Sequence, residues 1–278
     1  MSKLNFLTAG IPHSAKGASV LEGLREVKRL GLDGMELEFV RGVYMREPQA
    51  REAAGVAEGE GLALTVHAPY YINLHAKEPE KRRQSARRLY EAARIGRMAG
   101  AVSVAFHAGF YLGDTAESTY ASILEGTRAV RERLERNGSN GAALAPELTG
   151  KPTQWGDLEE LLRLSRDVEG VAPCIDFAHC HARSNGKHNT YEEFTAMLNR
   201  VEEELGRSAL ERLHIHVAGI RYGAKGELKH LNLDDSDMDY RALLRALRDK
   251  KVAGWLVCES PNIEDDARLL NRTYEELS

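Results

Sequence analysis

Two short apolar runs that each end in histidine frame a helical stretch near the middle of the chain. They read Leu62-Ala63-Leu64-Thr65-Val66-His67 and Val102-Ser103-Val104-Ala105-Phe106-His107. Apolar and β-branched residues dominate both runs, as in buried strands. Residues 80–99 lie between them and have the spacing of an amphipathic helix. The order strand, helix, strand predicts a βαβ unit with two parallel strands.

The same alternation continues along the whole chain. Eight runs are predicted as strands: Leu4–Ala9, Gly34–Phe39, Leu62–His67, Val102–His107, Ala142–Glu147, Ala172–Asp176, Leu213–Val217 and Gly254–Glu259. The predicted helices include Ser19–Leu30, Glu80–Ala99, Tyr120–Arg136, Leu158–Asp167, Tyr191–Leu205 and Tyr240–Asp249. The runs begin 28 to 41 residues apart, which fits right-handed crossovers between parallel strands. The pattern predicts an α/β protein with the (β/α)₈ TIM barrel fold.

A doubly wound open sheet is the competing architecture. Such a sheet usually has a glycine-rich phosphate loop after its first strand. Here the first run is followed by Gly10-Ile11-Pro12-His13, without the G-x-G-x-x-G pattern. Because no linker or shift in composition divides the chain, we expect one barrel domain over residues 1–278.

Composition and charge narrow the class of protein. The hydrophobic fraction of 42% and the charged fraction of 29% are those of an ordinary globular protein. Three scattered cysteines exclude a disulfide scaffold, and no apolar run has the length of a membrane span. A net charge of −4 gives no overall attraction to DNA, although bound cations can reverse the field at a cleft. We expect a cytoplasmic monomer with no membrane contact.

The last six predicted strands end at or beside a residue that can bind a metal ion. These residues are His67, His107, Glu147, Asp176, His216 and Glu259. The carboxyl ends of the strands in a parallel barrel meet at one face, so the six side chains should share a cavity. Three carboxylates buried together repel one another unless cations neutralise them, and the runs contain no lysine or arginine. The sequence therefore predicts a metal centre at this face.

The residue types indicate which ions the centre holds. A mixture of imidazoles and carboxylates suits Zn²⁺ and, less selectively, Mn²⁺ or Co²⁺. The excess of ligands over the needs of one ion predicts at least two ions, an arrangement used in phosphoester hydrolysis. His179 and His230 extend the cluster. His181 and His214 are expected to be structural, His214 as a partner of His216 or as a residue of the barrel interior.

Several phrases of the sequence resemble those of the endonuclease IV-type AP endonucleases, which belong to the xylose isomerase-like TIM-barrel superfamily. Residues 67–74 read His-Ala-Pro-Tyr-Tyr-Ile-Asn-Leu and resemble the signature HAPYLINL. Residues 106–109 resemble F-H-P-G, residues 146–150 resemble L-E-N-T-A-G, residues 175–182 resemble L-D-T-C-H-A, and residues 258–261 resemble L-E-T-P. These phrases occur in the family's order and span most of the chain.

The resemblance implies a barrel with three zinc ions that cuts DNA 5′ to an abasic site in base excision repair, with a metal-activated hydroxide as nucleophile. The implied ligands are His67, His107 and Glu147 for the first zinc, Glu147, Asp176, His216 and Glu259 for the second, and His179 and His230 for the third. Glu147 and Glu259 would be the catalytic carboxylates. The resemblance further implies that Tyr70 and Arg41 contact the abasic DNA.

The phrases after the seventh predicted strand depart from the family. The family's H-L-N-D is replaced by His216-Val217-Ala218-Gly219, and its D-R-H by Leu228-Lys229-His230. Leu228 thus stands where an aspartate should bind the third zinc. Glu227, Asp234 and Asp235 are the nearby carboxylates that could replace this aspartate. We therefore expect two or three zinc ions, with manganese as the alternative metal.

Two other functions fit the same residues. A sugar isomerase or epimerase of this superfamily would use one metal ion on Glu147, Asp176, His216 and Glu259. His67 and His107 favour the nuclease, because an isomerase does not need both as ligands. The second alternative, suggested by Leu228, is a relative that binds metal or damaged DNA without cutting it.

Overall fold

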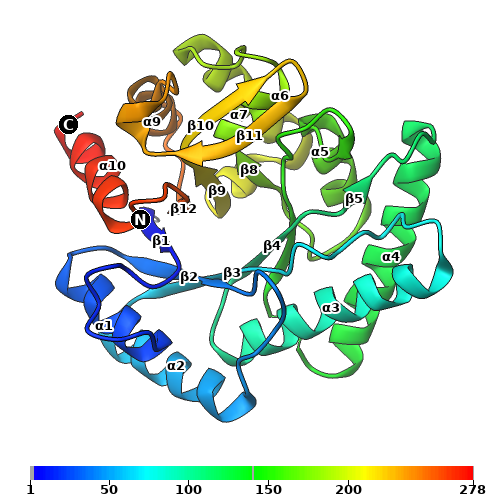
Figure 1. Ribbon diagram of the computed structural model, residues 1–278, viewed down its shortest axis with the longest axis horizontal. Coiled ribbons are helices and arrows are strands. Elements are labelled where there is room, and N and C mark those ends of the chain that lie inside the picture. The colour runs from blue at the N-terminus through cyan, green and yellow to red at the C-terminus, as the bar shows by residue number, and fades with distance from the viewer. Residues whose placement is uncertain (1–2, 140, 278) are drawn as a thin grey trace.

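The computed structural model describes residues 3–139 and 141–277, and its centre is one sheet of eight parallel strands (Figure 1). The strands are β1 (Leu4–Ala9), β2 (Gly34–Glu38), β3 (Ala63–His67), β4 (Ser103–Phe106), β6 (Ala143–Pro146), β8 (Cys174–Asp176), β9 (Leu213–Val217) and β12 (Gly254–Cys258). Their order in the sheet is β6-β4-β3-β2-β1-β12-β9-β8. Isolated parallel bridges from Leu144 to Val171 and from Glu147 to Cys174 join the two ends. The predicted TIM barrel is confirmed.

Helices follow the strands and form the outer ring of the barrel (Figure 1). They are α1 (Val20–Arg29), α2 (Glu47–Glu60), α3 (Pro79–Met98), α4 (Ala116–Arg136), α5 (Leu158–Asp167), α6 (Phe177–Arg183), α7 (Tyr191–Leu205), α8 (Arg207–Leu210), α9 (Tyr240–Asp249) and α10 (Glu264–Glu276). Side-chain caps fix several starts: Asp157 with Glu160 and Thr190 with Glu193 form capping boxes. Helices α5, α7 and α9 have the predicted bounds.

Two small hairpins and a 3₁₀ turn lie outside the main sheet. Strands β5 (Gly109–Phe110) and β7 (Gln154–Trp155) pair antiparallel, as do β10 (Gly219–Gly223) and β11 (Gly226–Leu231), and the turn η1 covers Leu233–Asp235. The β10–β11 hairpin packs on α6. This contact matters for the site because His230 lies in β11 and His179 lies in α6.

Several helices and strands differ from those predicted from the sequence. Helices α2, α6, α8 and α10 were not named from the sequence; for α2 the reason is that its buried face consists of the small residues Ala50, Ala53 and Ala57, so its apolar pattern is weak. Six predicted strands are also shorter than expected, and because β4, β6 and β12 end one residue early, His107, Glu147 and Glu259 each lie one residue beyond a strand end. Glu147 and Glu259 still donate backbone hydrogen bonds to Phe106 and Val217 of the neighbouring strands, so both stay in line with the barrel wall.

The main hydrophobic core lies between the sheet and the helices. Its largest fully buried side chains include Trp155, Phe6, Phe106, Phe177 and Phe194.

Among the residues that the structure describes, no helix is long and apolar enough to cross a membrane.

Two glycine substitutions test how tightly the barrel wall is packed. A Cβ atom on Gly34, at the start of β2, would lie 2.1 Å from the carbonyl oxygen of Ala63 in the adjacent strand. Gly34→Ala should therefore lower the free energy of unfolding by about 1–3 kcal/mol, as overpacking does. Gly55 lies in α2 with open space around it, so Gly55→Ala should raise that free energy by up to about 1 kcal/mol. Urea unfolding measures the free energy of unfolding of both variants. Equal changes in Gly34→Ala and Gly55→Ala would contradict the tight packing of the wall.

Candidate metal centre

The carboxyl ends of the strands bring the eight predicted metal ligands to one mouth of the barrel. His67 ends β3, His107 follows β4, Glu147 follows β6, Asp176 ends β8, His179 lies in α6, His216 lies in β9, His230 lies in β11 and Glu259 follows β12. Most of these side chains are buried, and the most exposed, His230, is 26% exposed. Residues separated by up to 192 positions thus share one small volume, since the parallel barrel collects its strand ends there.

The first group consists of His67, His107 and Glu147. Glu147 Oε2 lies 3.0 Å from His67 Nε2 and 3.1 Å from His107 Nε2. The other ring nitrogen of His67, Nδ1, donates a hydrogen bond of 2.8 Å to the carbonyl oxygen of Ala68. This bond fixes the tautomer and directs Nε2 toward the space beside Glu147, as in metal-binding histidines.

The second group uses the other oxygen of Glu147. Glu147 Oε1 lies 3.3 Å from His216 Nδ1, and the same nitrogen lies 3.4 Å from Glu259 Oε1. Asp176 completes this group, with ligand atoms of all four residues within 4.8 Å of one another. The two oxygens of one carboxylate therefore face two separate sets of ligands.

The third group joins α6 to the β10–β11 hairpin. His179 Nε2 lies 3.3 Å from His230 Nε2, while His179 Nδ1 contacts the carbonyl oxygen of Leu148 at 3.0 Å. Asp176 belongs to this group too. Glu227 approaches the pair, with its carboxylate oxygens 3.7 Å from His179 Nε2 and 3.9 Å from His230 Nε2.

Glu227 is therefore the carboxylate best placed to substitute for the aspartate that the family pattern expects. Leu228 is 64% exposed and lies on the outer side of β11. Asp234 and Asp235 are exposed in η1, and Asp235 accepts a hydrogen bond from Asn232. Of the three carboxylates considered from the sequence, Glu227 alone contacts both histidines.

The electrostatics of the cluster depend on its burial. Burial, helped by the nearby charges of Glu259 and Glu147 and opposed by that of His179, raises the pKa of Asp176 to about 6. Burial also opposes ionisation of Glu147, but the charges of His107 and His216 outweigh it and hold the Glu147 pKa well below its usual range. For His67, burial lowers the pKa, yet the hydrogen bond to Glu147 outweighs it and raises the pKa to about 10. Without cations, protons must hold these groups together, and metal binding would displace them.

The polar atoms of the mouth fit metal ions better than they fit one another. Buried polar atoms without an aligned hydrogen-bond partner include His107 Nε2, Glu147 Oε1, Asp176 Oδ2, His216 Nδ1 and Glu259 Oε2. Buried polar atoms are normally paired. The contacts between ligand atoms measure 3.0–3.4 Å, close to the edge of about 3.3 Å in a tetrahedron with metal–ligand bonds of about 2.0–2.1 Å. The donor set matches zinc, with two or more ions.

Two further carboxylates, Glu36 and Glu38 of β2, face the barrel interior and were not among the predicted site residues. Alternate residues of a strand face the same side, so the run Glu36-Leu37-Glu38 was a signal that both point into the barrel. Glu36 is fully buried, and Glu38 lies near the mouth with its Oε1 buried and unpaired. Burial raises the pKa of Glu38 to about 8, with Glu36 and Glu259 adding to the shift.

The remaining predicted residues lie around this cluster. Tyr70 is 54% exposed, and its ring centre lies 5.3 Å from that of His67, on the rim of the mouth. Arg41 is exposed in the turn after β2, at the same end of the barrel. His181 has the expected structural contacts, to the carbonyl oxygen of Lys187 and to Asp237. His214 lies inside the barrel, as expected.

Comparison with known proteins places the chain in a family. Its sequence matches the model of the xylose isomerase-like TIM barrel family over residues 24–276. The chain belongs to this family. It is 42% identical to an uncharacterised protein of Methanocaldococcus jannaschii over 99% of this chain and 98% of that one. It is 27% identical to a probable endonuclease 4 of Bifidobacterium longum, over 77% of this chain and 78% of the relative.

Solved structures with a similar fold include an endonuclease and an epimerase-like protein. Endonuclease IV from Thermus thermophilus superposes with a TM-score of 0.74 and 20% identity, covering 98% of this chain and 100% of that one. A D-tagatose 3-epimerase-like protein also gives a TM-score of 0.74, with 16% identity and 97% coverage of both chains. Identities this low support the shared fold alone, so the choice of activity depends on the site.

Glu147→Gln tests whether one carboxylate serves two groups of ligands. The amide keeps the volume but loses the negative charge shared by both groups, so metal should be lost from both. Elemental analysis of the purified protein after gel filtration measures this content. Asp237→Asn, a change beside His181 and outside the three groups, serves as control. A Glu147→Gln protein that keeps the metal content of the wild-type protein would contradict the idea that Glu147 serves both groups of ligands.

Glu227→Ala tests the third group, with Leu228→Ala as the matched control. Removing the carboxylate leaves His179 and His230 as a weaker set, so the protein should lose the metal of this group alone. Leu228→Ala should keep it, because that side chain is exposed. Competition with a chelator, followed by elemental analysis, compares the two; equal retention of metal would show that Glu227 is not a ligand.

Proposed function

We propose that this protein is a metal-dependent endonuclease that cleaves the DNA backbone on the 5′ side of an abasic site, as in base excision repair. The observation that carries the proposal is Glu147, whose Oε2 faces His67 and His107 while its Oε1 faces His216. A carboxylate shared in this way suits two adjacent ions. Such pairs of ions suit in-line displacement at a phosphodiester, in which charge develops on both the entering and the leaving oxygen.

The residues of the three groups would hold zinc, with manganese as the second choice. Divalent ions bound there supply an activated water and stabilise the charge of the leaving oxygen. The protein positions the ligands: the carbonyl oxygens of Ala68 and Leu148 fix the rings of His67 and His179. Glu147 and Glu259 are the proposed catalytic carboxylates, since they lie where the groups meet and Glu259 reaches the opening with 11% of its side chain exposed.

The rim offers contacts for damaged DNA. The exposed ring of Tyr70 would stack beside the gap left by the missing base, because aromatic side chains stack readily on nucleobases. Arg41, exposed after β2, would contact a phosphate. Bound cations at the mouth would offset the net charge of −4 near the DNA. The name of a relative, the probable endonuclease 4 of Bifidobacterium longum, agrees with an endonuclease activity.

A sugar isomerase or epimerase is the second candidate. Glu147, Asp176, His216 and Glu259 form a group that would serve a single ion, and such an ion assists proton transfer next to a carbonyl. The similarity to a D-tagatose 3-epimerase-like structure supports this candidate at the level of the fold. The third group and the pair His67 and His107 have no evident use in that reaction. If the protein neither cuts abasic DNA nor isomerises a sugar, the remaining interpretation is a relative that binds metal or DNA without cutting it.

The direct test is incision of a labelled duplex that contains one abasic-site analogue. The metal-loaded protein should cut 5′ to the lesion and leave an intact duplex uncut. His107→Ala should reduce the rate at least about a hundredfold, since even the partners of metal ligands contribute about 10–100-fold.

The same variant separates the two candidates. A one-metal isomerase should tolerate His107→Ala, because His107 lies outside its group of four ligands. Failure to cut abasic DNA by wild-type protein with full metal content would overturn the nuclease, and epimerisation of ketose sugars retained in His107→Ala would establish the alternative. Failure in both assays would leave the non-cutting relative.

A further inference from the structure

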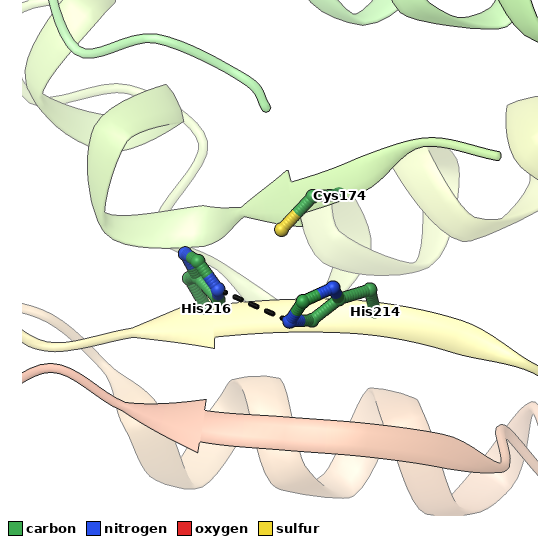
Figure 2. Close-up of side chains that lie close together, drawn as sticks. All are labelled: Cys174, His214 and His216. Carbon is green, nitrogen blue, oxygen red and sulfur yellow. Dashed lines mark hydrogen bonds between the residues drawn. The ribbon is translucent and has the colours of Figure 1, made fainter. Parts of the chain in front are cut away.

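A second cluster of metal-binding side chains lies inside the barrel, below the mouth. Cys174 comes from β8, His214 and His216 from β9, and Glu36 from β2. Figure 2 shows the Cys174 sulfur and the two imidazole rings turned into the same space between neighbouring strands, where Cys174 and His214 are register partners. All four residues are buried, with at most 2% exposure.

The ligand atoms of this interior cluster lie close together. Glu36 Oε2 lies 3.0 Å from His214 Nε2, and Glu36 Oε1 lies 3.0 Å from His216 Nε2. The two Nε2 atoms are 3.2 Å apart. The Cys174 sulfur and one nitrogen of each ring form a group within 4.8 Å.

Glu36 needs a positive charge beside it. Both of its oxygens are buried without an aligned hydrogen-bond partner, although a ring nitrogen lies 3.0 Å from each. A carboxylate buried in such a place is strongly destabilising unless a positive charge neutralises it. The two imidazoles share a hydrogen bond with each other (Figure 2), whereas the Glu36 contacts have the length of hydrogen bonds without their direction, as oxygens arranged around an ion would.

We propose that the interior cluster binds a zinc ion of its own, separate from the ions of the mouth. The proposed ligands are the Cys174 thiolate, Nε2 of His214, Nε2 of His216 and a carboxylate oxygen of Glu36. The nitrogen and oxygen contacts of 3.0–3.2 Å match the edge of about 3.3 Å of a zinc tetrahedron. A thiolate with two imidazoles selects zinc over magnesium or manganese. Zn²⁺ would balance the charges of the thiolate and Glu36, and the thiol proton would leave to solvent.

The neighbours of the cluster suit this role. His214 Nδ1 lies 2.9 Å from the Ser103 hydroxyl oxygen; as donor to Ser103, it leaves the Nε2 lone pair free for the ion. With four protein ligands and no open position, the site is structural rather than catalytic. The interior zinc site is therefore independent of which reaction the metal centre at the barrel mouth catalyses.

His216 links the interior site to the mouth. Its Nδ1 faces Glu147 and Glu259, whereas its Nε2 faces Glu36. With an ion on each side, the ring would lose both N–H protons and bridge the ions as an imidazolate. The interior ion would then fix the orientation of a ligand that the mouth also uses.

The sulfur of Cys174 gives a spectroscopic signal that the mouth cannot produce, since none of the eight predicted mouth ligands is a cysteine. Protein expressed in cobalt-supplemented medium would take up Co²⁺ while folding. The wild-type protein should show the near-ultraviolet charge-transfer band of a thiolate–cobalt bond. Cys174→Ala should abolish this band and, in zinc-loaded protein, remove a whole ion per chain.

Cys180→Ala is the matched control. Cys180 is also a buried cysteine, but its sulfur lies 3.8 Å from the Met197 sulfur, toward α7. This variant should keep both the band and the zinc content. A band that persists in Cys174→Ala, or no band in wild-type protein whose mouth carries cobalt, would overturn the proposal.

X-ray absorption at the zinc edge tests the site without any variant. The wild-type, zinc-loaded protein should show a sulfur neighbour at about 2.3 Å from zinc, in addition to nitrogen and oxygen at about 2.0–2.1 Å. A spectrum fitted by nitrogen and oxygen alone would mean that the cluster is held by hydrogen bonds to Glu36 and would refute the interior ion. Folded Glu36→Gln should lose the sulfur signal as well.

Discussion

The structure depends on neutralising carboxylates that the barrel forces together. Parallel strands must end at one face, and Glu147, Asp176 and Glu259 stand at three of those ends. Buried carboxylates repel one another unless imidazolium groups or metal ions lie between them. The histidines surround Glu147 on both sides, at 3.0–3.3 Å, and several of these contacts lack the direction of a hydrogen bond. Cations between these groups would neutralise the carboxylates. The placement of the histidines and the chemistry proposed for the site both follow from this need for positive charge.

Much of this arrangement could be predicted from the sequence, because it rests on local patterns. Strand runs followed by amphipathic helices indicated the barrel, and capped helices such as α5 and α7 were predicted to the residue. The strand-end ligands were found because parallel topology alone brings them together. Helix α2 escaped prediction since its buried face is made of alanines. Glu36 and Glu227 also escaped assignment: the contacts of Glu36 cross the barrel, and those of Glu227 depend on how a hairpin packs on α6.

The family explains why a barrel alone does not identify a reaction. Endonuclease IV and epimerase-like structures superpose equally well on this chain. A shared fold does not fix the activity, which depends on the side chains of the site. Here the additions are His67 and His107 on one side of Glu147, the His179 and His230 pair on the other, and Glu36 beneath His216. Each addition would increase the number of ions that the protein can hold, and a larger number of ions would favour phosphodiester chemistry over proton transfer.

The most direct test of a metal cluster centred on Glu147 is anomalous diffraction at the zinc edge from crystals of protein purified without chelators. A bridging Glu147 predicts one peak between its Oε2 and the rings of His67 and His107, and a second between Oε1 and His216. No anomalous peak beside Glu147, with these side chains ordered in their present positions, would contradict the cluster, since protons alone would then hold the carboxylates together.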